Sequence, residues 1–152
     1  MMIRTADFKD INGIISLWQE AFGDSEESIR FFLDRRFLPQ NTVVADDNGN
    51  IVSMLFFLDG KVAADNNLFS AYYLYAAATL KAHRGRGIMA KMLEFAKELA
   101  FERKVDLICL KPAETSLYDY YSKFGYKSVF ALKTVKIHRS KQVSSVKGLT
   151  DA

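Results

Sequence analysis

The chain has 152 residues, the size of one ordinary domain. Its 49% hydrophobic and 26% charged content is typical of a globular protein and argues against global disorder. The formal net charge of +3 leaves nucleic acid, an anionic membrane surface and a phosphorylated cofactor open as partners. The single cysteine, Cys109, excludes an internal disulfide framework, so we expect a cytoplasmic protein.

The hydropathy pattern predicts neither secretion nor membrane insertion. The N-terminus lacks a basic region followed by an apolar run, so we expect no signal peptide. The most apolar stretch, residues 69–80, contains Ser, Thr and several Tyr and is too short to cross a bilayer. We therefore expect no membrane partner.

The first part of the chain predicts a strand followed by two helices. Residues 2–5 form the strand, and Asp7 or Asp10 can cap a helix whose apolar residues recur every three or four positions. Asp24 or Ser25 can cap a second helix that has two glutamates in its first turn. The helices run from Ile11 to Phe22 and from Glu26 to Phe37.

The middle of the chain predicts strands joined by tight turns. Two strands, 42–45 and 51–58, flank a segment rich in Asp, Asn and Gly, which is a strong hairpin signal. Further turns are predicted at 59–60 and 65–67. Residues 68–80 then form a long strand with few polar positions, as expected for a strand buried on both faces.

The last part predicts two helices and further strands. An amphipathic helix follows a glycine-rich turn and runs to about Arg103. A strand at 107–110 precedes a short helix at 116–124, which Gly125 ends in a left-handed conformation. Residues 126–137 supply one or two terminal strands, and the last of these has no evident partner, which leaves a homodimer open.

Together these elements predict one mixed α/β domain over residues 1–137 and a loose tail over 138–152. The basic character belongs mostly to the end of the chain. Residues 133–152 carry a net charge of +4, and the other 132 residues carry −1. The overall charge therefore gives no support to a nucleic-acid-binding domain.

The stretch that carries chemistry is the glycine-rich turn Arg84-Gly85-Arg86-Gly87, between a buried strand and an amphipathic helix. Exposed N–H groups at a helix N-terminus bind phosphate, and glycines allow its close approach. No acidic residue occurs between Asp65 and Glu94, whereas four basic residues do. The competing interpretation is a solvated basic loop at the start of a core helix.

Three phosphate-binding patterns compete for this turn. The P-loop pattern is absent. Residues 85–90 match the dinucleotide pattern G-x-G-x-x-A, but Asp106 precedes its strand, whereas that pattern needs an acidic residue after the strand. Residues 84–89 resemble the acetyl-CoA loop of GNAT-superfamily N-acetyltransferases, R/Q-x-x-G-x-G/A, with Met89 in place of the final small residue.

A second block, Leu117-Tyr118-Asp119-Tyr120-Tyr121-Ser122-Lys123-Phe124-Gly125-Tyr126, is similar to the next motif of the same family. Two motifs in the right order, with a strand between them, are much more specific than either alone. The resemblance extends from the first strand to about residue 137. It implies a mostly antiparallel central sheet of six to seven strands, about four flanking helices and splayed central strands.

The resemblance also implies acetyl-CoA as the cosubstrate. It places the pantetheine arm along the end of the long strand through backbone groups, and the pyrophosphate on N–H groups of the glycine-rich turn. A backbone donor requires no particular side chain, so Met89 is compatible with this role. The residues assigned to the cosubstrate are Ala78, Thr79, Leu80, Arg84, Gly85, Arg86, Gly87, Ile88, Met89 and Ala90.

Acetyl transfer to an amine needs a base, a donor for the oxyanion and an acid for the departing thiolate. Tyr121 aligns with the general acid of the family, and a phenol with a pKa of about 10 is protonated at neutral pH. A core aromatic is the alternative. A backbone N–H near Thr79 is the candidate oxyanion donor. The base stays open among His83, Asp59, Glu20 and a water chain.

The leading hypothesis is an N-acetyltransferase that acts on a small-molecule or peptide amine. A non-catalytic acyl-CoA-binding or regulatory domain of the same fold is the alternative. A nucleic-acid-binding module is disfavoured, because the aromatic residues are not interleaved with Arg or Lys. Cys109 is expected to be a buried, inert thiol, and isolated His138 gives no reason to predict a metal site. In the pairs Phe31-Phe32 and Phe56-Phe57, one ring is expected in the core and the other at the acceptor cleft.

Overall fold

A computed structural model of the protein describes residues 1–130. The end of the segment 126–137, where one or two strands were expected, and the tail at 138–152 lie outside this range. The described chain forms one sheet in the order β1-β2-β3-β4-β5. The strands are β1 (Met2–Thr5), β2 (Thr42–Asp47), β3 (Asn50–Ala64), β4 (Asn67–Thr79) and β5 (Leu107–Cys109). The helices are α1 (Ile11–Phe22), α2 (Glu26–Arg36), α3 (Ile88–Glu102) and α4 (Ser116–Ser122), with 3-10 turns η1 (Phe8–Asp10), η2 (Pro39–Asn41) and η3 (Lys81–His83).

The sheet is mixed. The pairs β1–β2, β2–β3 and β3–β4 are antiparallel, whereas β4 and β5 pair in parallel. The expected count of six to seven strands is matched only roughly, since the described residues form five. Residues 126–130, where a further strand was expected to begin, have no strand pairing in the described chain. The expectation of about four helices is confirmed.

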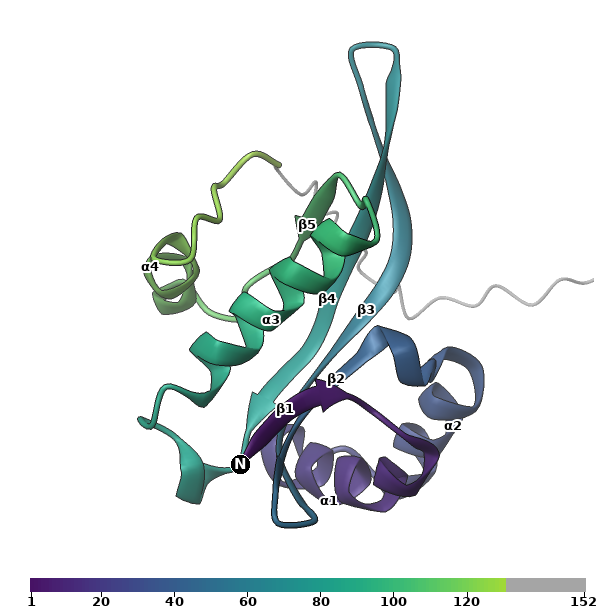
Figure 1. Cartoon of the computed structure of the whole chain (residues 1–152), viewed down its shortest axis with the longest axis vertical. Helices are drawn as coiled ribbons and strands as arrows, with labels where there is room; N and C mark the ends of the chain where they lie inside the picture. Colours follow the sequence, from purple (N-terminus) through teal and green to yellow (C-terminus); the bar gives the residue numbers. More distant parts are fainter. Residues whose placement is uncertain (131–152) are drawn as a thin grey trace, which may run out of the picture.

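The helices cover the sheet from both sides (Figure 1). Alternate residues of a strand point to opposite faces, and β3 shows this with two adjacent rings. Phe56 packs with α1 and α2 in one core cluster, and Phe57 packs with α3 in the other. Both rings are buried, at 1% and 2% exposure, so the expectation that one of them lines a cleft is wrong.

Hydrogen-bonding residues fix where the first two helices begin and end. Asp7 caps η1, and α1 follows directly from Asp10. Gly23 then ends α1 with a left-handed φ of 76°, which favours glycine. Ser25 accepts a hydrogen bond from Ser28 N at 3.3 Å and caps α2. The sequence therefore predicts the boundaries of both helices well.

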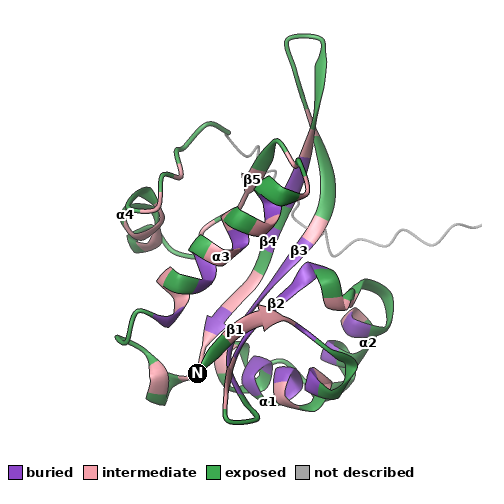
Figure 2. Cartoon of the chain, in the orientation of Figure 1, coloured by how far each residue is buried: buried purple, intermediate pink, exposed green. Residues whose placement is uncertain are grey.

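The hairpin of β3 and β4 projects beyond the helices (Figure 1). The turn expected at Asp59-Gly60 is wrong, because Asp59 and Gly60 pair with Tyr72 and Ala71 and the ladder continues. The chain reverses instead at Asp65 and Asn66, which both have positive φ. The first part of β4 is therefore exposed (Figure 2), which corrects the expectation of a strand buried on both faces throughout.

The second half of β4 departs from regular pairing. The register with β3 shifts between Met54 and Phe56, and Ala76 adopts a φ of 47°. Such a shift with an extra residue is a β-bulge, which bends the strand and increases its twist. On the other side, pairing with β5 ends at Tyr73 and Cys109, whereas β4 continues to Thr79. Within residues 1–130, no strand pairs with residues 74–79 on the side away from β3, and we call this side of residues 74–79 the unpaired edge of β4.

Candidate active site

The N-terminus of α3 is open, and its glycine-rich turn explains why. Gly85 and Gly87 adopt φ values of 75° and 71°, in the left-handed region that favours glycine. A Cβ added at either position would meet nothing within 4 Å, so the space above the turn is free. Gly87 occupies the N-cap position and therefore provides no side-chain cap.

This helix end offers hydrogen-bond donors that its own backbone does not use. The first bond within α3 runs from Lys91 N to Gly87 O at 3.2 Å, and the N–H groups of the first turn have no intrahelical acceptor. The Ile88 side chain is 3% exposed and Met89 packs against the core. Because these side chains point inward, their size does not obstruct an anion at the backbone.

The charges around the turn have one sign. Arg84, Arg86 and Lys91 are exposed, and the first turn of α3 contains no acidic residue. Arg84 Nε also donates to Thr79 O at 3.0 Å, which fastens the turn to the end of β4. A helix N-terminus with free donors and surrounding positive charge is suited to phosphate.

The acidic residue of the dinucleotide pattern lies elsewhere. Asp106 accepts hydrogen bonds from the N–H and hydroxyl groups of Ser70 at 2.8 and 2.6 Å. These bonds lower the pKa of the Asp106 carboxyl group and hold it at the start of β5. Ser70 is in the projecting hairpin, far along β4 from the glycine-rich turn. The geometry therefore disfavours the dinucleotide interpretation.

At the end of β4, the backbone N–H and C=O groups of successive residues face alternately toward β3 and away from it. Leu80 N donates to Val52 O at 3.0 Å, and Ala78 O accepts from Ser53 Oγ at 2.8 Å, so these groups face β3. Successive residues of a strand direct their backbone groups to opposite edges. The N–H of Thr79 consequently faces the unpaired edge of β4. Among the three residues predicted to line the pantetheine arm, Thr79 has the N–H group directed there.

Ser53 also positions the end of β4, a role that was not predicted from the sequence. Its side chain is fully buried, and its Oγ lies 2.8 Å from Thr79 Oγ1 as well as bonding Ala78 O. It thus holds both residues at the end of β4. The available signal was a serine inside the apolar run of β3, because a polar side chain buried in a sheet needs a hydrogen-bond partner.

Tyr121 is positioned by the end of α4. Its carbonyl accepts from Phe124 N at 2.9 Å and from Tyr126 N at 3.4 Å, while Gly125 turns the chain with a φ of 84°. Its ring packs edge-on against Tyr120 and Tyr126, with centroids 5.5 and 5.7 Å away. Burial, followed by the neighbouring Tyr120, raises the pKa of Tyr121, which keeps the phenol protonated.

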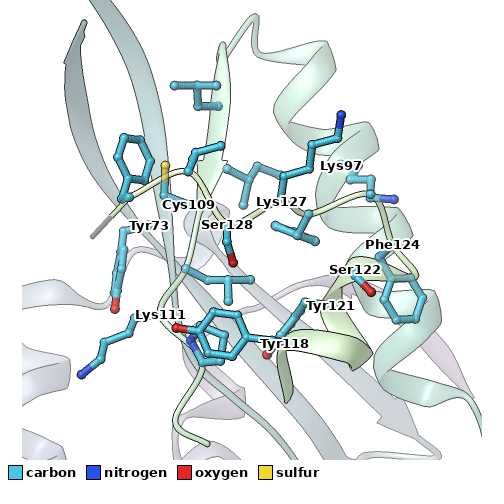
Figure 3. Close-up of a pocket in the computed structure, with 18 of the residues that line it drawn as sticks. Tyr73, Lys97, Cys109, Lys111, Tyr118, Tyr121, Ser122, Phe124, Lys127 and Ser128 are labelled. Carbon is cyan, nitrogen blue, oxygen red and sulfur yellow. The ribbon is translucent and has the colours of Figure 1, made fainter. Parts of the chain in front are cut away.

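Tyr121 also lines a cavity of about 1070 Å³ beside β5. In Figure 3, Tyr73, Cys109 and Lys111 stand on one side of this cavity and the residues of α4 on the other. Cys109 is half-buried rather than fully buried, and burial raises the pKa of its thiol. The predicted pyrophosphate turn lies at the N-terminal end of α3 and does not line the cavity.

The candidate bases occupy three different environments. Glu20 Oε1 accepts from Lys81 N at 2.7 Å, so Glu20 connects α1 to η3. Asp59 Oδ2 accepts from Asn41 Nδ2 at 3.1 Å, and Asp59 pairs with Tyr72, several residues before the unpaired edge. The Nδ1 atom of His83 is buried without a hydrogen-bond partner in the described chain. The two carboxylates therefore already hold structural contacts.

Two features of other protein classes are absent from residues 1–130. No cluster of three or more metal-ligating side chains occurs within residues 1–130. Over the same range, every helix is too short or too polar to traverse a membrane.

The fold and the site together define an α/β domain in which an uncapped helix terminus with exposed basic side chains lies beside a partly unpaired strand. The chain belongs to the acetyltransferase (GNAT) domain family, whose model matches residues 2–129. The resemblance predicted from the two sequence motifs is thereby confirmed. A search of curated proteins found no match.

Solved structures share the fold over most of the chain. A transcriptional regulator from Bacillus halodurans has a TM-score of 0.73 and 20% identity, covering 91% of this chain and 99% of its own. A predicted acetyltransferase with acetyl-CoA from Clostridium acetobutylicum has a TM-score of 0.69 and 23% identity, covering 89% and 95%. An aminoglycoside 6'-N-acetyltransferase from Acinetobacter haemolyticus has a TM-score of 0.68 and 16% identity, covering 92% and 100%.

Proposed function

We propose that the protein transfers the acetyl group of acetyl-CoA to a primary amine by direct attack of the amine. The observation that carries this proposal is the uncapped N-terminus of α3, with free space above Gly85 and Gly87. Membership of the GNAT family supports acetyl-CoA as the donor. The residues fit its pyrophosphate, because first-turn N–H groups and exposed arginines surround an open turn.

Each part of the site has a distinct role in this proposal. The first-turn N–H groups of α3 and the side chains of Arg84 and Arg86 bind the pyrophosphate. The N–H of Thr79 faces the unpaired edge of β4, where it can donate to the thioester carbonyl oxygen as negative charge develops there. Ser53 holds the end of β4 in this orientation through Ala78 O.

Tyr121 supplies the proton to the departing sulfur. Its raised pKa means that the proton is present throughout the neutral range. The group is half-buried between two other tyrosine rings, which restricts its orientation. A positioned acid of this kind contributes to the rate without contributing to cosubstrate affinity.

Replacement of Tyr121 tests its role. We expect Tyr121→Phe to lower kcat at least several-fold while leaving the Kd of acetyl-CoA unchanged. Tyr120→Phe is the matched control, since it removes a phenol from the neighbouring ring of the same helix. CoA release measures turnover, and titration calorimetry measures affinity. An unchanged kcat in Tyr121→Phe would remove Tyr121 from the mechanism.

A non-catalytic acyl-CoA-binding domain is the second candidate. The similarity in fold to a protein described as a transcriptional regulator favours it. The two candidates differ in a direct measurement, in which the protein is incubated with acetyl-CoA and a panel of primary amines. An enzyme produces free CoA and an amine whose mass increases by one acetyl group. A regulatory domain binds acetyl-CoA and produces neither.

A further inference from the structure

Five aromatic rings gather on the face of the sheet that α1 and α2 cover. Trp18 is at their centre, with ring centroids 5.1 to 6.0 Å from its neighbours. We call these residues the aromatic patch: Trp18, Phe22, Phe32, Phe56 and Tyr75. Trp18 and Phe56 are buried as in an ordinary core, whereas Phe22 is 48% exposed and Tyr75 is 38% exposed. The cluster therefore continues from the core to the surface.

The aromatic patch lies alongside the part of β4 that ends at the proposed reaction site. Two contacts of α1 bracket this part, because Trp18 packs against Tyr75 at 6.0 Å and Glu20 accepts from Lys81 N at 2.7 Å. Thr79, whose N–H faces the unpaired edge, lies between these two positions along the chain. Tyr75 itself directly precedes the bulge residue Ala76.

Two exposed acidic side chains lie beside the patch. Asp24 Oδ2 accepts from Trp18 Nε1 at 2.8 Å and is exposed, as is Glu20. The helix α1 contains no basic residue. A primary amine with a pKa near that of lysine arrives at neutral pH as an ammonium ion. Carboxylates and aromatic faces both attract such a cation, so this side of β4 favours the amine just as the basic turn favours the phosphate.

From this arrangement we infer that the acceptor is a primary amine attached to an aromatic or other flat apolar group. This inference rests on the proposed acetyltransferase function. The flat group packs on the exposed rings of Tyr75 and Phe22, while the amine reaches the end of β4. A sugar amine would place hydroxyl groups against the faces of these rings, which offer them no conventional hydrogen bond in exchange for lost hydration.

Acetyl transfer to such an acceptor needs no reagent other than the amine and acetyl-CoA. The amine nitrogen forms a bond to the acetyl carbon as the C–S bond of the thioester breaks. The ammonium loses two protons in total, of which one replaces the proton that Tyr121 gives to the sulfur and the other passes to solvent. The products are the N-acetylated amine and CoA as the free thiol.

A comparison of two amines tests the inference on the unmodified protein. The probes are 2-phenylethylamine, which has a flat apolar group, and glucosamine, which has a polar ring. We expect kcat/KM from CoA release to be at least tenfold higher for 2-phenylethylamine. An equal or higher kcat/KM for glucosamine overturns the inference and leaves the enzymatic function intact. Release with neither amine overturns the inference, and release with no amine of the panel, despite acetyl-CoA binding, overturns both.

Variants of Tyr75 identify the surface involved. We expect Tyr75→Ala to lower kcat/KM for 2-phenylethylamine about tenfold, with the KM of acetyl-CoA and kcat/KM for glucosamine unchanged. Tyr75→Phe keeps the ring and is expected to retain the preference. Phe101→Ala is the matched control, because Phe101 is 84% exposed, lies near the C-terminal end of α3 and is outside the patch. Thermal unfolding of each variant checks the fold. An equal loss for both amines in Tyr75→Ala contradicts the assignment.

Discussion

The helices α2 and α3 pack on the same sheet but begin in opposite ways. α2 begins at a serine whose hydroxyl accepts from a first-turn N–H, and Glu26 and Glu27 follow in its first turn. α3 begins at Gly87, with no side-chain cap and no acidic residue in its first turn. A cap contributes about 1 kcal/mol to stability. The helix α3 therefore lacks a stabilising cap at the position where we propose that a ligand binds.

The largest effect is expected when α3 is given an acidic cap at its N-terminus, so that it resembles the N-terminus of α2. Gly87→Asp introduces a cap and a negative charge where we place the pyrophosphate. We expect acetyl-CoA to bind about a hundredfold more weakly, equivalent to about 2.7 kcal/mol, because like charges repel at the helix terminus. Titration calorimetry measures the Kd.

Gly49→Asp is the matched control for that variant. Gly49 lies in the turn between β2 and β3, also has positive φ, and also has nothing within 4 Å of an added Cβ. The backbone strain of the two variants is therefore comparable. A similar loss of affinity in both variants would contradict a pyrophosphate site at α3.

The N-terminus of α1 provides a third case, in which an ion pair closes the helix. Asp10 is buried, accepts from Asp7 N at 2.7 Å, and pairs with Arg4, which also pairs with Asp46. We expect Asp10→Asn to lower the free energy of unfolding by about 2 kcal/mol, because charged hydrogen bonds are lost. Urea unfolding at neutral pH measures this change.

The same residue gives the protein a pH dependence with a definite sign. The Arg4 guanidinium holds the pKa of the Asp10 carboxyl group below its usual value of about 3.9. The contribution of the Arg4–Asp10 pair to stability is therefore fully present when the pH is above the ordinary pKa. It is lost as the pH falls through the lower pKa that Asp10 has in the folded protein. Asp10→Asn should unfold with a shallower acid dependence, and an unchanged acid profile would contradict this account.

Removal of the N-cap from α2 tests the converse case, in which a cap is lost outside the proposed cosubstrate site. Ser25→Ala removes the hydroxyl that accepts from Ser28 N, so we expect a loss of about 1 kcal/mol of stability. The Kd of acetyl-CoA should not change, because this helix end is not part of the proposed cosubstrate site. A change in the Kd of acetyl-CoA without a change in the unfolding midpoint would contradict the view that Ser25 acts only as a stabilising cap.

The smallest expected effect concerns one exposed charge at α3. Arg86→Gln should weaken acetyl-CoA binding about threefold at low salt, since an exposed charge contributes little and salt screens it. The difference from the unmodified protein should nearly vanish near 1 M salt. Affinity titrations at two salt concentrations would measure it, and a difference independent of salt would indicate a structural role for Arg86.

Local signals predicted the parts of the fold that depend on neighbouring residues. Gly23 and Ser25 lie where the sequence places helix ends, because caps and left-handed turns act within a few residues. Gly125 has the expected left-handed φ, but α4 ends earlier, at Ser122 with Lys123 as its C-cap. Asp59-Gly60 has the composition of a turn, yet pairing with Tyr72 and Ala71 keeps it in a strand. Tertiary pairing overrode the local preference there.

The site was predictable in type but only partly in geometry. The glycine-rich turn follows from its residues, since glycine is needed at positive φ. The bulge at Ala76 is not readable, because nothing in the run of three alanines indicates where the register shifts. The direction of the Thr79 N–H depends on that register. The aromatic patch likewise needs the packing of α1 and α2 against β4, which joins residues far apart in the chain.

The hydrogen bond from Lys81 N to Glu20 has a consequence for the order of binding. Lys81 begins η3, which leads to the glycine-rich turn, and Glu20 belongs to the helix that carries Trp18 and Phe22. One bond thus connects the surfaces proposed for the two substrates. A ligand that orders this junction lowers the entropic cost for the other, and such coupling is equal in both directions. Cooperative binding of amine and acetyl-CoA would then be a property of a single contact between a helix and a turn.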